Sequence, residues 1–221
     1  MAQATGQTLR IDIVSDVMCP WCFVGYHQLR LAQEQTGIPI EVFWHPFELN
    51  PQMAPEGEEL REHLMGKYGI TVEQSIEARA RLEAIGDELN APIRFTDGKR
   101  IYNTFALHRL LHWAAESGQA GALKLTLFEA YFTDSKEMND PQAMADVAAA
   151  LGLDRARALE ILTGDDYAEE VRAKQQFWTS KGISGVPAMV FERQHLVTGA
   201  QGVENYANIL TQLAAAQAGA A

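Results

Sequence analysis

Two kinds of sequence pattern divide this chain, and their order constrains its fold more than any other feature. Both ends alternate short β-branched and aromatic runs with single helical segments, whereas residues 58–181 are rich in Ala, Leu, Glu and Arg at helical spacing. Glycines and prolines break this middle segment into six or seven expected helices, two of which begin at the N-cap residues Asp140 and Asp154. We therefore expect an α/β unit that is interrupted by a block of helices.

The N-terminal end has the pattern of a strand, a helix and a second strand. Residues 9–14 become continuously apolar, as in a strand that enters a core. Pro20 and Gly37 mark the start and the stop of a helix. Residues 38–47 form a second β-branched and aromatic run. Two strands joined by a helix in one sheet are expected to be parallel, with a right-handed crossover.

The C-terminal end has the pattern of a hairpin followed by a helix. Residues 186–191 and 195–199 are separated by a three-residue turn, so we expect them to be antiparallel. Residues 202–213 form a closing helix, and the Ala-rich end to Ala221 is expected to fray.

Together these patterns predict a mixed sheet of the order βαβ-ββα, with a large all-helical insertion between its two halves. We expect residues 8–57 and 182–215 to form one discontinuous domain and residues 58–181 to form the insertion domain. A chain of 221 residues can bury a core of this size without a metal or a disulfide.

Charge and hydropathy exclude several classes of function. The chain has 18 Lys and Arg against 29 Asp and Glu, and this net charge of −11 disfavours binding to nucleic acid or to an anionic membrane surface. No apolar run reaches the length of a membrane helix. The N-terminal residues do not have the pattern of a secretory signal, so we expect a cytoplasmic protein. The sequence does not indicate an oligomeric state.

Cys19 and Cys22 are the two cysteines of the chain, and they lie where the first strand gives way to the helix. At this spacing, in the first helical turn, they can close a small disulfide ring. Because a helix N-terminus favours negative charge, we expect the pKa of Cys19 to lie below the value of about 8.5 of a free thiol. A thiolate attacks disulfides, and Cys22 is placed to resolve the mixed disulfide. This pattern favours thiol–disulfide exchange over a structural disulfide.

Two further patterns leave alternatives open. His108 and His112, four residues apart, could complete a zinc site with the cysteines, but their distance along the chain from Cys22 is far longer than in zinc-binding motifs, so we expect no metal. Val186-Pro187 opens an expected strand, a position where proline is tolerated. The bond before Pro187 is either cis or an ordinary trans bond at a strand start.

In combination, these motifs resemble the DsbA-like branch of the thioredoxin superfamily, and most of all its FrnE-type oxidoreductases. The matching segments are Cys19-Pro20-Trp21-Cys22, Asn103-Thr104-Phe105-Ala106-Leu107-His108-Arg109-Leu110, Gly182-Ile183-Ser184-Gly185-Val186-Pro187 and Gly199-Ala200-Gln201. The resemblance covers nearly the whole chain. It implies a thioredoxin fold with a helical insertion, a nucleophilic Cys19, a resolving Cys22 and a cis bond before Pro187.

The resemblance also implies what the site binds. The main chain at Val186 would pair with an extended substrate, as in β-strand addition. The partners would be proteins that carry thiols or disulfides, or glutathione as a redox partner, with no bound cofactor. Pro20-Trp21 stands where the periplasmic oxidants have Pro-His, so we expect Cys19 to be less oxidising than in those proteins. Trp21 either forms an apolar wall for substrate or packs on the insertion.

A second enzyme class has a similar pattern. Kappa-class glutathione transferases and 2-hydroxychromene-2-carboxylate isomerases share the insertion topology and a similar Asn-Thr…His-Arg helix. They usually have a Ser at the position of Cys19, which activates the thiol of glutathione, so two cysteines favour redox chemistry here. Asn103 and His108 either line the substrate cleft in both classes or are a capping Asn and a solvated His.

A non-catalytic alternative is a chaperone-like binding module whose insertion presents an apolar groove. Aromatic side chains at helical spacing could line such a groove, although this pattern is more typical of a core. The candidates are Tyr131, Phe132, Phe177 and Trp178.

Overall fold

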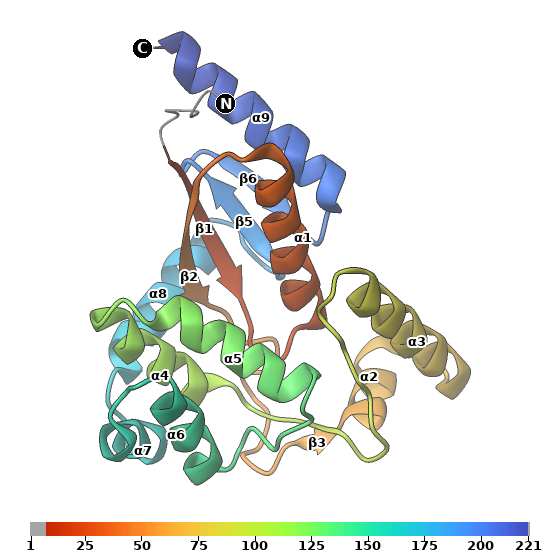
Figure 1. Ribbon diagram of the computed structural model, residues 1–221. Helices are drawn as coiled ribbons and strands as arrows, with labels where there is room; N and C mark the ends of the chain where they lie inside the picture. The colour runs from red at the N-terminus through yellow and green to blue at the C-terminus, as the bar shows by residue number, and fades with distance from the viewer. Residues whose placement is uncertain (1–7, 221) are drawn as a thin grey trace.

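The computed structural model describes residues 8–220 and contains a four-stranded mixed sheet (Figure 1). The strand order is β2-β1-β5-β6. The parallel pair of β1 and β2 and the antiparallel hairpin of β5 and β6 confirm the predictions, and β1 also pairs with β5 in an antiparallel way. The strands are β1 (Leu9–Ser15), β2 (Ile40–Pro46), β5 (Ala188–Phe191) and β6 (His195–Thr198). β2 and β5 begin two residues later than predicted, directly after Pro39 and Pro187, since a proline has no N–H for a strand ladder.

Two helices cover one face of the sheet. α1 (Pro20–Thr36) and α9 (Val203–Ala220) pack on each other and on the buried side chains of β1 (Figure 1). α1 ends at Gly37, as predicted, in the left-handed conformation with φ of 67°. α9 continues to Ala220, so the expected fraying after residue 213 is wrong. Alanine strongly favours helix, and the Gln217 amide donates a hydrogen bond of 3.0 Å to Glu192 in the hairpin turn.

The segment between the two halves of the sheet is mainly helical. Its helices are α2 (Leu60–Tyr68), α3 (Val72–Glu88), α4 (Phe105–Glu116), α5 (Ala120–Phe132), α6 (Pro141–Ala150), α7 (Arg155–Thr163) and α8 (Ala168–Ser180). The predicted N-caps are confirmed, because Asp140 and Asp154 accept hydrogen bonds from first-turn N–H groups at 2.9 and 2.8 Å.

The insertion is not entirely helical, which corrects one prediction. β3 (Glu58–Glu59) pairs with β4 (Arg100–Ile101) in a short antiparallel ladder. Each strand has two residues and its partner lies far away along the chain, so no local periodicity could indicate it. The predicted division into a domain of residues 8–57 and 182–215 and an insertion of residues 58–181 stays a prediction.

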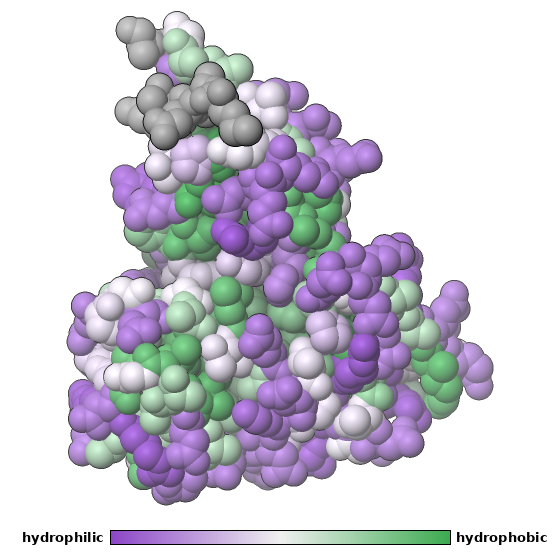
Figure 2. Space-filling model, in the orientation of Figure 1, coloured by the Kyte–Doolittle hydropathy of each residue, from purple (hydrophilic) through white to green (hydrophobic). Residues whose placement is uncertain are grey.

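The insertion packs directly against the start of α1. Phe23 lies against Phe128 and Phe132 of α5, with ring centroids 5.5 and 5.3 Å apart. On the face shown in Figure 2, hydrophilic residues predominate, and apolar patches lie both on the part that contains the sheet and on the insertion. No helix within residues 8–220 has the length and apolar composition needed to cross a bilayer. The first turn of α1 is therefore enclosed by both parts of the molecule.

Candidate functional site

The two cysteines lie at the N-terminal end of α1, directly after β1. Cys19 is the N-cap residue, and the N–H groups of Cys22 and Phe23 donate to its carbonyl oxygen at 3.0 and 3.3 Å. Pro20 occupies the first helical position, where a missing N–H costs no hydrogen bond. Both thiols are reduced and buried. One helical turn therefore holds both sulfur atoms, as the sequence predicts.

The segment before β5 lies against Cys19. The Val186–Pro187 bond is cis, which confirms the expectation from the resemblance. The Cys19 thiol donates a hydrogen bond to the carbonyl oxygen of Val186, with a sulfur–oxygen distance of 3.6 Å. Pro187 packs on Gly25 of α1, where an added Cβ would lie 3.3 Å from both Pro187 Cγ and Met189 Cε. Gly25 thus allows this loop to approach the helix closely.

The thiols of Cys19 and Cys22 hydrogen-bond to each other, so the ionisation of one affects the other. The pKa of Cys19 is raised well above its ordinary value by its hydrogen bond to Cys22 and by burial. Burial also acts against ionisation of Cys22, but hydrogen bonds from Cys19 and Ser15 and the charge of Lys124 lower its pKa. The expectation of a depressed pKa at Cys19 is therefore wrong for the reduced pair. The first proton leaves from Cys22, and the Cys19 thiol, which donates to the carbonyl oxygen of Val186 while both thiols are protonated, then donates to the thiolate so formed.

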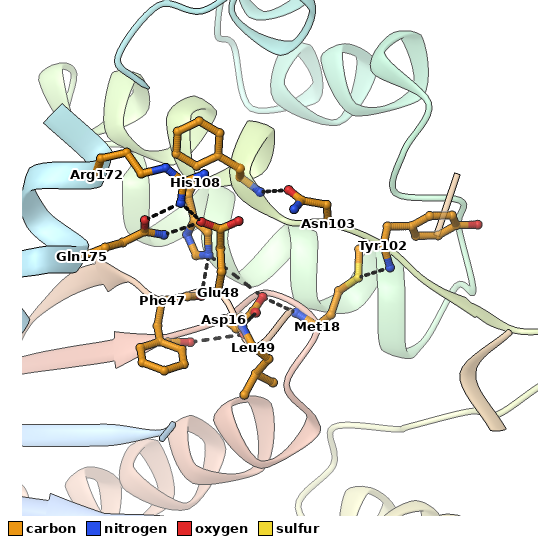
Figure 3. Close-up of polar contacts among 12 residues, drawn as sticks. Asp16, Met18, Phe47, Glu48, Leu49, Tyr102, Asn103, His108, Arg172 and Gln175 are labelled. Carbon is orange, nitrogen blue, oxygen red and sulfur yellow. Dashed lines mark hydrogen bonds and ion pairs between the residues drawn. The ribbon is translucent and has the colours of Figure 1, made fainter. Parts of the chain in front are cut away.

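Asp16 is a buried carboxylic acid directly after β1. Its two oxygens accept hydrogen bonds from the N–H groups of Met18 at 3.2 Å and Leu49 at 2.7 Å (Figure 3). Burial raises the pKa of Asp16, while these bonds and the charge of Lys124 oppose the shift. Asp16 therefore ties the loop before Cys19 to the loop after β2.

Lys124 comes from α5 and is 1% exposed. Its ammonium group lies 5.5 and 4.7 Å from the ring centroids of Trp44 and Phe128. Burial lowers the pKa of Lys124 to about 8, although the neighbouring Cys22, Asp16 and Cys19 oppose the shift. At neutral pH the amine is mainly protonated, so the insertion supplies a positive charge beneath the dithiol.

His108 of α4 completes this buried group. Its Nε2 donates a hydrogen bond of 2.8 Å to the carbonyl oxygen of Phe47 and lies 4.0 Å from Asp16 Oδ1 (Figure 3). Burial, together with the charge of Lys124, lowers the pKa of His108 to about 3. The imidazole is therefore neutral at physiological pH, and it supports the loop that follows β2.

A cavity of about 310 Å³ opens beside Cys19, and we call it the Cys19 pocket. Pro20, Trp21 and Val186 line it next to the sulfur, and Trp21 is 40% exposed there. Farther in, its walls come mainly from α2, α3 and the segment that follows α3. The main apolar lining residues there are Leu60, Leu64, Tyr68, Leu82, Phe95 and Ile101. Of the predicted site residues, Cys19, Pro20, Trp21 and Val186 are thus brought together around one cavity.

Three predicted substrate-binding residues do not line the Cys19 pocket: Asn103, His108 and Pro187, the last of which packs on Gly25. Asn103 accepts a hydrogen bond of 2.9 Å from the N–H of Phe105 at the start of α4 and faces a separate pocket. Neither Asn103 nor His108 lines the Cys19 pocket, so their contact with substrate stays a prediction. Within residues 8–220, no group of three or more His, Cys, Asp or Glu side chains is arranged to hold a metal ion.

The four aromatic residues of the predicted binding groove do not share one surface. Tyr131 and Phe132 are buried and line the Cys19 pocket. Phe177 and Trp178 of α8 line a different cavity, beside β6 and the face of the sheet opposite α1. These four residues therefore do not line one continuous groove, which the alternative of a binding module would require.

Sequence reasoning missed Gly25 and Lys124, although each carried a signal. Gly25 is a glycine inside a helix, which costs about 1 kcal/mol relative to alanine and therefore indicates a close contact. Lys124 is a charged residue in an otherwise apolar helical run, between Leu123 and Leu125. Asp16 follows a buried strand and carried no comparable signal.

Comparison with known proteins places this geometry in a family. The model of the DSBA-like thioredoxin domain matches residues 10–211. The chain is 34% identical to a probable DsbA oxidoreductase from Streptomyces coelicolor, with a TM-score of 0.85 over 92% of this chain and 89% of that chain. It is 28% identical to the uncharacterized protein YwbO from Bacillus subtilis over 83% of this chain and 86% of that protein.

More distant structures share the fold. The cytosolic disulfide reductase DsbM from Pseudomonas aeruginosa is 18% identical, with a TM-score of 0.64 over 93% of this chain and 98% of DsbM. A 2-hydroxychromene-2-carboxylate isomerase is 15% identical, with a TM-score of 0.71 over 96% of this chain and 99% of that chain. At these identities the likeness concerns the fold alone.

Proposed function

Because the chain belongs to the DSBA-like thioredoxin domain family, we propose that it exchanges disulfides with protein or small thiol substrates through Cys19 and Cys22. The observation that carries the proposal is the position of Cys19, which faces both the pocket and the carbonyl oxygen of Val186. A disulfide bound in the pocket would therefore meet Cys19 first. Cys22 is fully buried behind it.

The reaction would proceed through one mixed disulfide. As Cys19 attacks a substrate disulfide RS–SR, its proton passes to the Cys22 thiolate, and the products are Cys19–S–SR and RS⁻. After Cys22 loses this proton, its sulfur attacks Cys19, closes the intramolecular disulfide and releases the second RS⁻. The dithiol gives up two electrons and two protons, and the substrate disulfide becomes two thiols. The reverse sequence would oxidise a substrate dithiol.

Lys124 and Val186 would have separate roles in this reaction. The charge of Lys124 stabilises the Cys22 thiolate, which accepts the proton of Cys19. Val186 would bind the substrate main chain through its carbonyl oxygen, which the Cys19 thiol occupies in the substrate-free state. Trp21 would form an apolar wall at the mouth of the pocket. Glutathione remains a candidate redox partner, and we keep the cytoplasm as the proposed location.

Trapping of the mixed disulfide tests this proposal. We expect Cys22→Ser to accumulate a covalent adduct with insulin that has intact disulfides, because the resolving sulfur is absent. The adduct is detected by intact-protein mass and is released by dithiothreitol. The matched control is the variant with both cysteines replaced by serine, which should form none. If Cys22→Ser forms no adduct and the unmodified protein does not reduce insulin either, thiol–disulfide exchange is not its activity. If that variant instead conjugates glutathione to electrophiles at the unmodified rate, the transferase or isomerase class is correct.

A further inference from the structure

Arg79 is a buried cation that faces the Cys19 pocket from α3. It is 7% exposed, and its Nε and Nη2 atoms are buried without a hydrogen-bond partner within residues 8–220. Ser75 lies one helical turn earlier on the same face, is 1% exposed, and its hydroxyl also has no partner there. A buried guanidinium without a partner costs free energy, so these donors indicate a missing acceptor.

The two other basic residues that line the pocket already have partners. The Lys67 ammonium donates to Leu49 and Asn50 at 2.9 and 2.6 Å. His63 bonds to Glu58 and Asn50 at 2.6 and 3.1 Å. The unmet hydrogen-bonding capacity of the pocket is therefore concentrated at Arg79 and Ser75.

Together with Arg61 and Lys99, Arg79 gives this region three positive charges, against the two carboxylates of Glu59 and Asp97. Arg61 and Lys99 lie near Arg79, and the pKa of Lys99 is lowered to about 8 by burial and by the charge of Arg79. The carboxylate of Asp97 is fully exposed and lies 3.8 Å from Arg61, while Glu59 accepts the N–H of Glu62 at the start of α2. In a chain with a net charge of −11, this local excess of positive charge favours an anionic ligand.

The remaining walls define the rest of the ligand. Leu60, Leu82, Phe95 and Ile101 form an apolar interior, and the Arg79 guanidinium lies 5.5 Å from the centroid of the Phe95 ring. Cys19 stands at the same cavity. An occupant that satisfies all three features has an apolar body, an acidic group and a sulfur atom.

We propose that the Cys19 pocket binds a small apolar thiol or disulfide that carries a carboxylate, and that Arg79 and Ser75 bind this carboxylate. The inference rests on the proposed function for its redox step and names a substrate class for it. Cys19 would attack the disulfide RS–SR with release of RS⁻, and Cys22 would then release the second RS⁻. The ligand gains two electrons and two protons, and the enzyme dithiol becomes a disulfide.

Binding is tested without redox chemistry, in the full chain with Cys19 and Cys22 both replaced by serine. The probes are 4-(methylthio)benzoate and its uncharged methyl ester, measured by isothermal titration calorimetry. We expect the acid to bind about tenfold more tightly than the ester, because only the carboxylate accepts charge-assisted hydrogen bonds from the Arg79 guanidinium. Arg79→Gln should abolish this preference. Arg81→Gln, an exposed arginine on the same helix, should retain it.

Exchange is tested with reduced protein and two aromatic disulfides. We expect Arg79→Gln to slow the reaction with 5,5′-dithiobis(2-nitrobenzoate), which has a carboxylate on each ring, about tenfold. The reaction with uncharged 2,2′-dithiodipyridine should keep its rate. Thermal unfolding of Arg79→Gln should occur at the temperature of the unmodified protein or above it, because the variant removes an unpaired buried charge.

The two proposals fail in different ways. Equal binding of acid and ester in the cysteine-free protein overturns the carboxylate site, whatever the exchange rates are. The apolar class of ligand is overturned if reduced protein reacts faster with glutathione disulfide than with 5,5′-dithiobis(2-nitrobenzoate) and if Arg79→Gln slows both reactions by the same factor. A preference for the acid that depends on Arg79, together with no exchange in the cysteine-containing protein, supports the carboxylate site and overturns the proposed function.

Discussion

At Lys124, a positive charge is held in apolar surroundings close to Cys22 and Asp16. The charge is costly to bury, as the lowering of its pKa to about 8 indicates. It also lowers the pKa of Cys22, so the residue affects the chemistry without contacting the pocket mouth. Lys124 is a positioning residue and not a catalytic one, since it affects the reaction through its charge on Cys22 and not by contact with a substrate.

We predict that Lys124→Met raises the pKa at which the dithiol loses its first proton, because methionine fills a similar volume without the charge. A rise of about one unit corresponds to about 1.4 kcal/mol and reduces the thiolate population near neutral pH about tenfold. The ultraviolet absorbance of the thiolate, followed as a function of pH, measures this shift. Lys136→Met, which changes an exposed lysine 3.7 Å from Asp134, is the matched control. If both variants titrate like the unmodified protein, Lys124 does not stabilise the thiolate.

Individual residues were predicted from the sequence where local features identify them, but not where their role depends on packing. Cys19 and Cys22 were predicted because their spacing and the neighbouring Pro20 are local features. Arg79 and Arg81 have almost the same sequence neighbourhood, yet one is buried at the pocket and the other is exposed. Only the packing of α3 against the rest of the chain distinguishes them. The positive charge that helps to lower the pKa of Cys22 likewise comes from Lys124, which is far away in the sequence.

Helix α1 and the loop before β5 act together as one structural element. The close contact at Gly25 allows Pro187 to pack on the helix, and this contact holds Val186 beside Cys19. The sequence predicted both segments, but their contact joins the two ends of the chain. Pro20 and Gly37 are local signals that determine where the helix begins and ends. The pairing of β3 with β4 depends on contacts between distant parts of the chain, and sequence analysis missed it.

We predict that Gly25→Val lowers the free energy of unfolding by about 1–3 kcal/mol, the usual cost of overpacking a dense contact. The rate of disulfide exchange should fall as well, because Val186 is displaced from Cys19. Urea unfolding and exchange kinetics measure the two effects. Gly66→Ala in α2, where an added Cβ meets nothing within 4 Å, should instead be neutral or stabilising by up to about 1 kcal/mol. Equal stability of both variants would contradict the proposed contact.

In the molecule as a whole, the insertion supplies buried polar groups and pocket walls that the sheet and α1 do not provide. It contributes the buried charge of Lys124, the imidazole of His108 and most of the walls of the Cys19 pocket. The order of elements was predictable from alternating sequence patterns. The way the insertion packs over the dithiol was not, because it depends on contacts such as that of Phe23 with Phe128 and Phe132.

The neutral His108 has a consequence for stability against acid. Its pKa is about 3 in the folded protein and near 6.5 when unfolded, so between these values the unfolded chain binds a proton that the folded chain does not. The stability associated with His108 is present above pH 6.5 and is lost as pH falls towards 3. Down to pH 4.5 we expect this loss to be about 2–3 kcal/mol.

Comparison with His108→Gln isolates this effect, since the glutamine amide can still donate to the carbonyl oxygen of Phe47 but does not titrate. The neighbouring Asp16 and Lys124 are present in both proteins. We predict that urea unfolding at pH 6.5, 5.5 and 4.5 shows a steeper decline for the unmodified protein than for the variant. Parallel declines would show that His108 does not remain neutral in the fold.

The central claim is that Cys19 and Cys22 form a reversible two-electron couple, and redox equilibration of the unmodified protein tests it most directly. The protein, started once reduced and once oxidised, is incubated in glutathione buffers of graded potential, and the fraction with an intramolecular disulfide is measured by thiol alkylation and mass. The account predicts one transition, identical from both directions, in which about 30 mV changes the ratio of oxidised to reduced protein tenfold. If Cys19 and Cys22 stay reduced across the whole range, or if the two starting states never converge, the account is wrong.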